Sequence, residues 1–270
     1  MSDSSSRGWA LVLGASSGFG EACSRALGAA GWNVFGVHLD RKGTLPHVEE
    51  IVAAIRGEGV RAEFFNVNAA DEGKRAEVVG EMTKALAGEP GEKRVTVLLH
   101  SLAFGTLKPF FGESREASMA KPQIEMTLDV MAHSLVYWTQ DLYQAGLFGD
   151  SAKIFAMTSA GDHIVWPAYG AVSAAKCALE SHIRQIAVEL APKNISANAI
   201  RAGVTDTPAL RKIPGNQSMI DRVLGIHPAK RLTTPEDVAG ALVALCSGNT
   251  RWISGNVIGV DGGEDIAGGN

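Results

Sequence analysis

The sequence has few cysteines and no long apolar run, and both absences narrow the class of protein. Only three of the 270 residues are cysteine, they lie far apart, and no CxxC pair occurs. We therefore expect neither a disulfide scaffold nor a metal site, and a reducing compartment fits best. No apolar run approaches the roughly 20 residues of a membrane span. The polar start at residues 1–7 lacks the apolar core of a signal peptide, so we expect a cytoplasmic protein without membrane contact.

An excess of positive charge is also missing. Lys and Arg number 25 against 29 Asp and Glu, which gives a net charge of −4. Such a chain offers no broad basic face to a phosphate backbone, so we expect no nucleic-acid partner. Hydrophobic residues make up 46% of the chain, enough for a sizeable core, which excludes disorder as its main state. Glycine, at 31 residues, is abundant and indicates tight turns or close approach to a ligand.

Short apolar runs alternate with longer amphipathic stretches from one end of the chain to the other. This alternation predicts a parallel sheet buried between two layers of helices. The expected fold class is α/β: a Rossmann-type, doubly wound, seven-stranded parallel sheet in a single domain over residues 9–265, with a flexible N-terminus at 1–8 and a C-terminal tail at 266–270. We expect strands at 10–13, 33–39, 61–66, 95–100, 153–158, 195–200 and 256–260, and helices at 18–30, 47–57, 71–87, 123–145, 169–191 and 235–246.

Two long connections break this alternation, at residues 104–122 and 203–228. Both follow the carboxyl ends of expected strands, where ligands bind in open α/β sheets. Long connections inside a domain are usually functional, so we expect a binding site there, with plain surface loops as the alternative.

The turn after the first strand has the glycine spacing of a dinucleotide site. Glycine lets the backbone approach a pyrophosphate, and the N-terminus of the following helix offers free N–H groups. The strand–turn–helix context that such a site needs is present. We expect cofactor contacts from Gly14, Ser16, Ser17, Gly18, Phe19 and Gly20.

The end of the second strand is expected to bind the adenosine ribose and so to distinguish NADH from NADPH. The expected strand-end residue, His38, is not acidic, and two basic residues, Arg41 and Lys42, follow closely. A basic environment accepts the 2′-phosphate of NADPH, whereas an acidic side chain binds the 2′-hydroxyl of NADH. We expect NADPH, with Asp40 as the residue that would instead favour NADH.

A serine, a tyrosine and a lysine form the candidate catalytic set. Ser159 ends a strand, and Tyr169 and Lys176 lie seven residues apart at the start of a helix. Seven steps return to nearly the same helix face about 10 Å further on. A nearby cation favours the phenolate, so Lys176 is expected to lower the pKa of Tyr169 and make it a proton donor.

With these motifs, the sequence resembles the short-chain dehydrogenase/reductase family over essentially its whole length. The resemblance rests on the glycine turn, on the pair Asn66 and Val67, on residues 198–207 and on residues 260–263. It departs where the family's usual tyrosine falls on Val172, four residues before the lysine. Another departure is the tetrapeptide at 100–103, His-Ser-Leu-Ala, in place of the usual Asn-Asn-Ala-Gly.

These departures look like the enoyl-acyl-carrier-protein reductase branch, and residues 187–193 look most like enoyl reductase III, an NADPH-using type. The resemblance implies an enoyl thioester substrate on acyl carrier protein or coenzyme A, NADPH as the cofactor and a homotetramer. It implies that Tyr169 stabilises the enolate and that Lys176 holds the nicotinamide ribose, with Ser159 nearby. Further cofactor contacts are implied for Asn66, Val67, Ser101, Leu102, Ala103, Gly203, Val204 and Thr207.

Two other functions stay open at this point. One is a carbonyl or alcohol oxidoreductase of the same fold, acting on a ketone, a 3-ketoacyl thioester or a sterol. The other is a nucleotide-sensing protein without turnover, against which the intact set of Ser159, Tyr169 and Lys176 counts. Fold alone does not decide between them.

Overall fold

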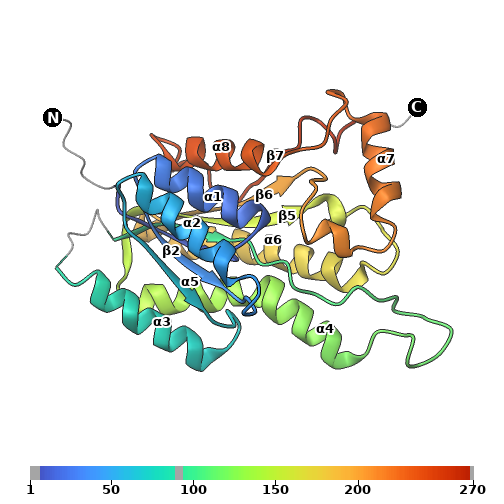
Figure 1. Cartoon of the computed structure of the whole chain (residues 1–270), viewed down its shortest axis with the longest axis horizontal. Helices are drawn as coiled ribbons and strands as arrows, with labels where there is room; N and C mark the ends of the chain where they lie inside the picture. Colours follow the sequence, from blue (N-terminus) through green and yellow to red (C-terminus); the bar gives the residue numbers. More distant parts are fainter. Residues whose placement is uncertain (1–6, 89–93, 268–270) are drawn as a thin grey trace.

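A seven-stranded parallel sheet forms the centre of the molecule (Figure 1). The computed structural model describes residues 7–88 and 94–267. The strand order is β3-β2-β1-β4-β5-β6-β7, and every neighbouring pair is parallel, which confirms the predicted fold class. The strands are β1 (Trp9–Leu13), β2 (Asn33–His38), β3 (Ala62–Asn66), β4 (Val95–His100), β5 (Phe148–Ser159), β6 (Ser196–Ala202) and β7 (Val257–Val260).

Helices cover both faces of this sheet (Figure 1). Helix α1 packs between α2 and α8 on one face, and α3, α4, α5 and α6 cover the other. Helix α7 lies beyond the carboxyl ends of the strands, at the edge of the molecule. The helices are α1 (Gly18–Ala29), α2 (Leu45–Gly57), α3 (Glu72–Ala85), α4 (Lys121–Leu128), α5 (Ser134–Gln144), α6 (Gly170–Leu190), α7 (Asn216–Ile226) and α8 (Pro235–Cys246).

Alternating side chains of β1 supply both halves of the core. Trp9 and Leu11 point into the half that Trp138 of α5 completes. Ala10 points into the other half, with Leu242 of α8. All five residues are fully buried. Strands buried on both faces need apolar residues at successive positions, which is why they appear as continuous apolar runs in the sequence.

Three segments differ from the sequence-based expectation. The helix expected at 123–145 is interrupted by a π-helical turn, Asp129–His133, beside which the Ser134 hydroxyl donates to the Val130 carbonyl at 2.7 Å. Hydroxyls that bond back to the preceding turn bend helices. Strand β5 begins at Phe148 rather than 153. The loop expected at 203–228 contains α7, which follows Gly215 in the left-handed conformation.

The two ends of the chain lie mostly outside the described residues. Residues 1–6 and 268–270 are not described, so the expected flexible N-terminus and C-terminal tail stay predictions there. Arg7 and Gly8 are held by backbone hydrogen bonds: the Arg7 N–H donates to the Gly31 carbonyl, and the Gly8 carbonyl accepts from Asn33.

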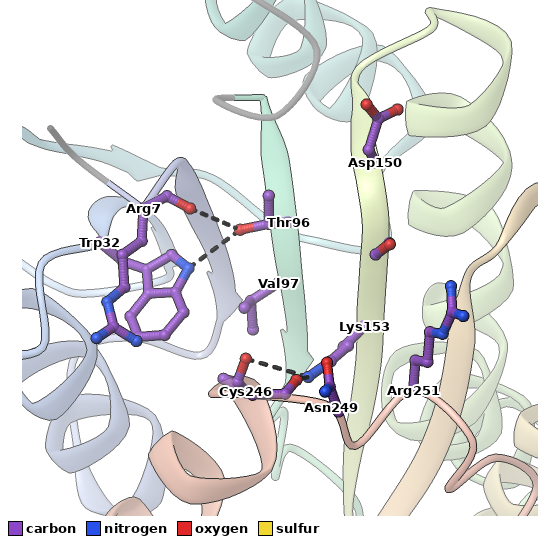
Figure 2. A pocket seen from close by; sticks show the side chains of 11 residues that line it. Arg7, Trp32, Thr96, Val97, Asp150, Lys153, Cys246, Asn249 and Arg251 are labelled. Atoms are coloured by element: carbon purple, nitrogen blue, oxygen red, sulfur yellow. Dashed lines mark hydrogen bonds between the residues drawn. The ribbon is translucent and has the colours of Figure 1, made fainter.

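A buried lysine fixes the end of α8 to the sheet (Figure 2). The Lys153 Nζ donates to the carbonyl oxygens of Leu245 and Cys246, at 2.9 and 3.1 Å, and to the Thr250 Oγ1 at 2.7 Å. The last carbonyls of a helix have no intrahelical partner, and a cation there also complements the helix dipole. A cavity of about 750 Å³ lies beside this lysine, with Trp32 and Thr96 on its opposite wall.

Replacing this lysine should destabilise the fold. We expect Lys153→Met to lower the free energy of unfolding by about 2–4 kcal/mol, because it leaves buried helix carbonyls without donors. Urea unfolding of both proteins measures the difference. The matched control is Lys193→Met, at an exposed position, which should change stability by less than about 0.5 kcal/mol. Equal effects of the two substitutions would contradict the role given to Lys153.

Candidate active site

The glycine turn after β1 packs so closely that larger residues do not fit. Gly14 has a φ of +88°, and a Cβ on it would lie 2.5 Å from the Ser101 carbonyl oxygen. A Cβ on Gly20 would lie 1.9 Å from the Gly14 carbonyl oxygen. The turn opens α1 between β1 and β4, where the strand order reverses and dinucleotides bind in folds of this kind. These features fit the pyrophosphate of a nicotinamide cofactor.

Several other predicted cofactor residues gather around this turn. A Cβ on Gly14 would lie 3.4 Å from the Leu102 Cδ2, and a Cβ on Gly18 would lie 3.4 Å from the Thr207 Cγ2. Ser17 adopts an extended conformation at the start of α1. The structure therefore brings Ser101, Leu102 and Thr207 to the glycine turn, although they lie far from it in the sequence.

Other predicted contacts are engaged within the protein. Phe19 packs against the core beneath α1, and Val67 against the core on the other face. The Val204 N–H donates to the Glu264 carboxylate at 2.9 Å. Gly203 lies against Thr233 and the same carboxylate. Ala103 is exposed at the start of the loop after β4.

An acidic side chain, Asp40, lies just beyond the carboxyl end of β2, where folds of this kind bind the adenosine ribose. The Asp40 carboxylate accepts from the Thr44 Oγ1 at 2.7 Å and pairs with the His38 Nδ1 at 3.0 Å. Partial burial opposes the charged form, but hydrogen bonds from Ser16, Thr44 and His38 hold the pKa of Asp40 below its ordinary value. The carboxylate is therefore ionised at neutral pH, beside the glycine turn.

The Asn66 side chain holds this aspartate in place. Its Oδ1 accepts from the Asp40 N–H at 2.9 Å, and its Nδ2 donates to the Asp40 carbonyl at 3.0 Å. His38 is buried beneath the carboxylate, whereas Arg41 and Lys42 are exposed. The held carboxylate of Asp40 is suited to accept hydrogen bonds from ribose hydroxyls.

The three candidate catalytic residues lie at the carboxyl end of β5 and the start of α6. Ser159 ends β5, and Tyr169 directly precedes the first residue of α6. A Cβ on Gly161 would lie 2.5 Å from the Tyr169 ring and 3.3 Å from the Ser159 Oγ, so the two side chains share one narrow space. The Ser159 Oγ is buried and forms no hydrogen bond of good geometry with the described residues. The residue before the tyrosine, Ala168, has a φ of +60°, a strained conformation for alanine.

Burial dominates the protonation of this set. It raises the pKa of Tyr169, with the Ser159 hydroxyl opposing, so the phenol keeps its proton. We expected Lys176 to lower the pKa of Tyr169, but in the protein without cofactor burial raises that pKa and Lys176 does not act on it. Burial also lowers the pKa of Lys176 to about 8, against the opposing charge of Glu180. The Lys176 Nζ donates to the Met157 carbonyl at 2.7 Å.

The two long connections flank the tyrosine. A Cβ on Gly170, the first residue of α6, would lie only 2.6 Å from the Phe110 ring. The Trp166 Nε1 donates to the Pro214 carbonyl at 3.2 Å and so links the loop before Tyr169 to the second connection. Phe111 is 93% exposed. This side of the site can therefore offer apolar surface to a substrate.

A charged network in the loop after β5 is not visible in the sequence. The two ring nitrogens of His163 form hydrogen bonds with the Asp162 and Asp265 carboxylates. Arg201 of β6 bonds to the same two carboxylates, at 3.4 and 2.7 Å. The residues come from three distant segments, and no local spacing relates them. The network ties the C-terminal segment to the loop that follows β5.

The described residues contain no group of three or more His, Cys, Asp or Glu side chains placed to hold a metal ion. Within the same part of the chain, no helix has the length and apolarity needed to cross a membrane.

The doubly wound sheet, the glycine turn at its switch point and the Ser-Tyr-Lys set define a short-chain dehydrogenase/reductase. The chain belongs more narrowly to the enoyl-(acyl carrier protein) reductase family, whose family model matches residues 14–264. This assignment confirms the resemblance to the enoyl-acyl-carrier-protein reductase branch, whereas the narrower likeness to enoyl reductase III stays a prediction.

Among the similar proteins are several named enoyl-[acyl-carrier-protein] reductase [NADH] FabI. The protein from Aquifex aeolicus is 31% identical over 172 residues, which cover 64% of this chain and 63% of the relative. That from Rickettsia felis is 32% identical, covering 64% and 65%, and that from a Synechocystis species is 30% identical, covering 65% and 66%. The chain thus spans about two-thirds of the length of these relatives.

A solved structure is similar over nearly the whole chain. The crystal structure of the Aquifex aeolicus enoyl-[acyl-carrier-protein] reductase (NADH) superposes with a TM-score of 0.81 and covers 98% of this chain and 99% of that one. At 24% sequence identity, this likeness supports the fold.

The prediction of NADPH as cofactor is wrong, because these relatives are named NADH enzymes. The structure supplies the physical reason. We expected His38, Arg41 and Lys42 to accept a 2′-phosphate, but His38 is buried against Asp40, whose carboxylate is ionised beside the glycine turn. The sequence signal that would have corrected the prediction was Asp40, two residues beyond the expected strand end.

Proposed function

We propose that this protein is an NADH-dependent enoyl-acyl-carrier-protein reductase that saturates the trans-2 double bond of an enoyl thioester. One observation carries the proposal: a partly buried, protonated tyrosine at the start of α6, seven residues before a buried lysine, in a fold whose glycine turn is suited to a dinucleotide. Family membership and the names of the relatives support it.

Each residue of the site has a distinct part in this reaction. Tyr169 donates a hydrogen bond to the thioester oxygen, where negative charge develops as the double bond is reduced. Lys176 holds the nicotinamide ribose, and Asp40 accepts hydrogen bonds from the adenosine ribose. The glycine turn binds the pyrophosphate. When bound, NADH supplies the hydride.

The position of the tyrosine favours an enoyl over a keto substrate. In the family's usual pattern the phenol lies four residues before the lysine, and here it lies seven before it, which is about 5 Å further along the helix. Hydride goes to the β-carbon of an enoyl thioester, two bonds from the carbonyl carbon. The proton donor must then reach a more distant oxygen than in a ketone reductase.

NADH oxidation followed by absorbance tests the proposal. We expect rapid oxidation with a trans-2-enoyl thioester and little with a 3-ketoacyl thioester of the same chain length. Activity on the keto substrate alone would replace the proposal with a carbonyl reductase. Cofactor binding without turnover of either thioester would indicate a nucleotide-sensing protein.

We propose that the acyl group is carried by acyl carrier protein, with coenzyme A as the alternative, and that the enzyme works in the cytoplasm as a homotetramer. Parallel assays with both carriers decide the first point. Light scattering of the purified protein decides the assembly.

A further inference from the structure

One histidine bridges two carboxylates in the loop that joins the candidate catalytic serine to the tyrosine. The His163 Nδ1 lies 2.5 Å from the Asp162 Oδ1, and its Nε2 lies 2.9 Å from the Asp265 Oδ1. Carboxylate oxygens only accept hydrogen bonds, so both contacts are favourable only when both ring nitrogens carry a proton. The geometry therefore requires the charged, imidazolium form of His163.

Neighbouring elements supply the other polar groups of this cluster. Arg201 of β6 pairs with Asp265 at 2.7 Å and with Asp162 at 3.4 Å. From α6, the Cys177 Sγ donates to the Asp162 carbonyl at 3.2 Å. Burial, and then the charge of Asp162, raise the pKa of the Glu180 carboxyl on the same helix. Partial burial lowers the pKa of the bridging histidine, but hydrogen bonds and charges from its two carboxylates outweigh burial and raise that pKa above its ordinary value.

The cluster is joined to the tyrosine through the turn that precedes the histidine. Asp162 ends a 3₁₀ turn that begins at Ala160 and is closed by a backbone hydrogen bond of 3.1 Å to the Ala160 carbonyl. The middle residue of this turn is Gly161, and a Cβ on it would lie 2.5 Å from the Tyr169 ring. Because the turn packs so closely against the ring, a displacement of Asp162 would also displace the phenol.

The rest of the loop packs weakly against the protein. Val165 is 92% exposed and Ile164 is 36% exposed. Ala168 has a φ of +60°, which costs free energy and persists only where the surrounding structure holds it. The Trp166 Nε1 donates to the Pro214 carbonyl at 3.2 Å, at the far end of the loop. The charged cluster therefore holds the near end, next to the tyrosine ring.

We propose that His163 and Asp265 are positioning residues for Tyr169: the charged imidazole joins the loop to the C-terminal segment and so keeps Gly161 against the tyrosine ring. Neither residue takes part in the chemical step. The kinetic part of this inference rests on the proposed function, whereas the attachment of the loop does not.

The substitution His163→Gln tests the attachment and its effect on the reaction. Glutamine is neutral and reaches one carboxylate at most, so the loop should loosen. Small misplacements of a reacting group cost up to about 100-fold in rate, so we expect kcat for enoyl reduction to fall by about tenfold. The dissociation constant of NADH, measured by fluorescence titration, should change by less than about twofold, because the glycine turn and Asp40 are untouched.

A double-mutant cycle shows whether the two residues act together. Asp265→Asn should also lower kcat by about tenfold, because it removes the carboxylate on the other side of the imidazole. Residues that act through one contact are not additive, so His163→Gln/Asp265→Asn should be about tenfold slower than the wild type. A loss of about 100-fold in the double variant would mean that the two residues act independently, and it would overturn the proposal.

Hydrogen exchange of the loop amides, measured by mass spectrometry on residues 160–168, follows the attachment without any turnover. The raised pKa means that the charged form, and with it the attachment, is present at pH 6 and is lost as the pH rises through that pKa. Wild-type protection, corrected for the intrinsic rate, should therefore be lower at pH 9 than at pH 6. His163→Arg stays charged, so its protection should not fall and its kcat should lie within about threefold of the wild type.

His47→Gln is the matched control. His47 is also exposed and also contacts two carboxylates, Glu21 at 2.8 Å and Glu50 at 3.5 Å, but on α1 and α2 rather than on the loop. It should leave kcat and loop exchange unchanged. Loop protection that is unaltered in His163→Gln would overturn the attachment, and a looser loop with a wild-type kcat would overturn the positioning of Tyr169.

This inference and the proposed function can fail separately. Absence of enoyl reduction in the wild type would refute the proposed function, while loop exchange would still test the attachment. The His163 side chain is 46% exposed, so we expect His163→Gln to fold. If circular dichroism shows that it does not, Asp265→Asn and the pH dependence of wild-type exchange decide: unchanged protection in both would overturn the proposal.

Discussion

Tyr169→Phe should lower the kcat of enoyl thioester reduction by at least about 100-fold, because it removes the hydrogen bond to the oxygen on which charge develops. The phenyl ring keeps the packing against Ser159 and Gly161, so the fold should be unaffected. NADH binding, measured by fluorescence titration, should change by less than about twofold, since the phenol contributes little to holding the cofactor.

The matched control for this experiment is Tyr143→Phe. Tyr143 lies on α5, is 44% exposed and is remote from the site, so its loss of a hydroxyl should leave kcat unchanged. An unchanged kcat in Tyr169→Phe would remove this tyrosine from the reaction. A parallel loss of NADH affinity would mean that the phenol binds the cofactor rather than the substrate oxygen.

The second large effect concerns the choice between NADH and NADPH. Asp40→Ser should reduce the preference for NADH over NADPH, expressed as the ratio of kcat/KM values, by about 10- to 100-fold. The carboxylate lies at the ribose end of the crevice, and two charges of like sign about 4 Å apart repel by a few kcal/mol in a partly solvated site. Serine removes the charge and keeps a hydroxyl.

Thr44→Val is the control for Asp40→Ser. It removes a hydrogen bond to the same carboxylate and leaves the charge, so the cofactor preference should stay close to that of the wild type. If Asp40→Ser left the ratio of kcat/KM values for NADH and NADPH unaltered, a group other than Asp40 would determine the cofactor preference. A wild-type enzyme that prefers NADPH would refute the role of Asp40 outright.

The ribose site illustrates where inference from sequence stops. The pattern of residues 33–42 predicts a buried strand that ends near a charged turn, and both features are present. Whether histidine, aspartate, arginine or lysine faces the crevice depends on the path of the chain after the strand. The two hydrogen bonds between Asn66 and the Asp40 backbone fix that path, and Asn66 comes from the next strand.

The interrupted helix is a second example. Amphipathic periodicity over 123–145 predicts one continuous helix, whereas the structure has a π-helical turn at Asp129–His133. The hydroxyl bond of Ser134 to Val130 and its contact with the buried His100 both depend on neighbouring structure. Likewise, Pro214 and Gly215 indicate a loop, and the packing that forms α7 directly after them is not visible locally.

The sequence by itself determined the parallel sheet, the glycine turn and the spacing of Tyr169 and Lys176. These depend on local chemistry: apolar runs for strands buried on both faces, glycine for a backbone that other residues would block, and helical periodicity. Only the tertiary structure bonded Asp40 to His38, brought Glu180 to Thr158 and joined Asp162, Arg201 and Asp265. The physical reason is that burial and electrostatic pairing are set by residues distant in the chain, and these decide which charged forms are stable.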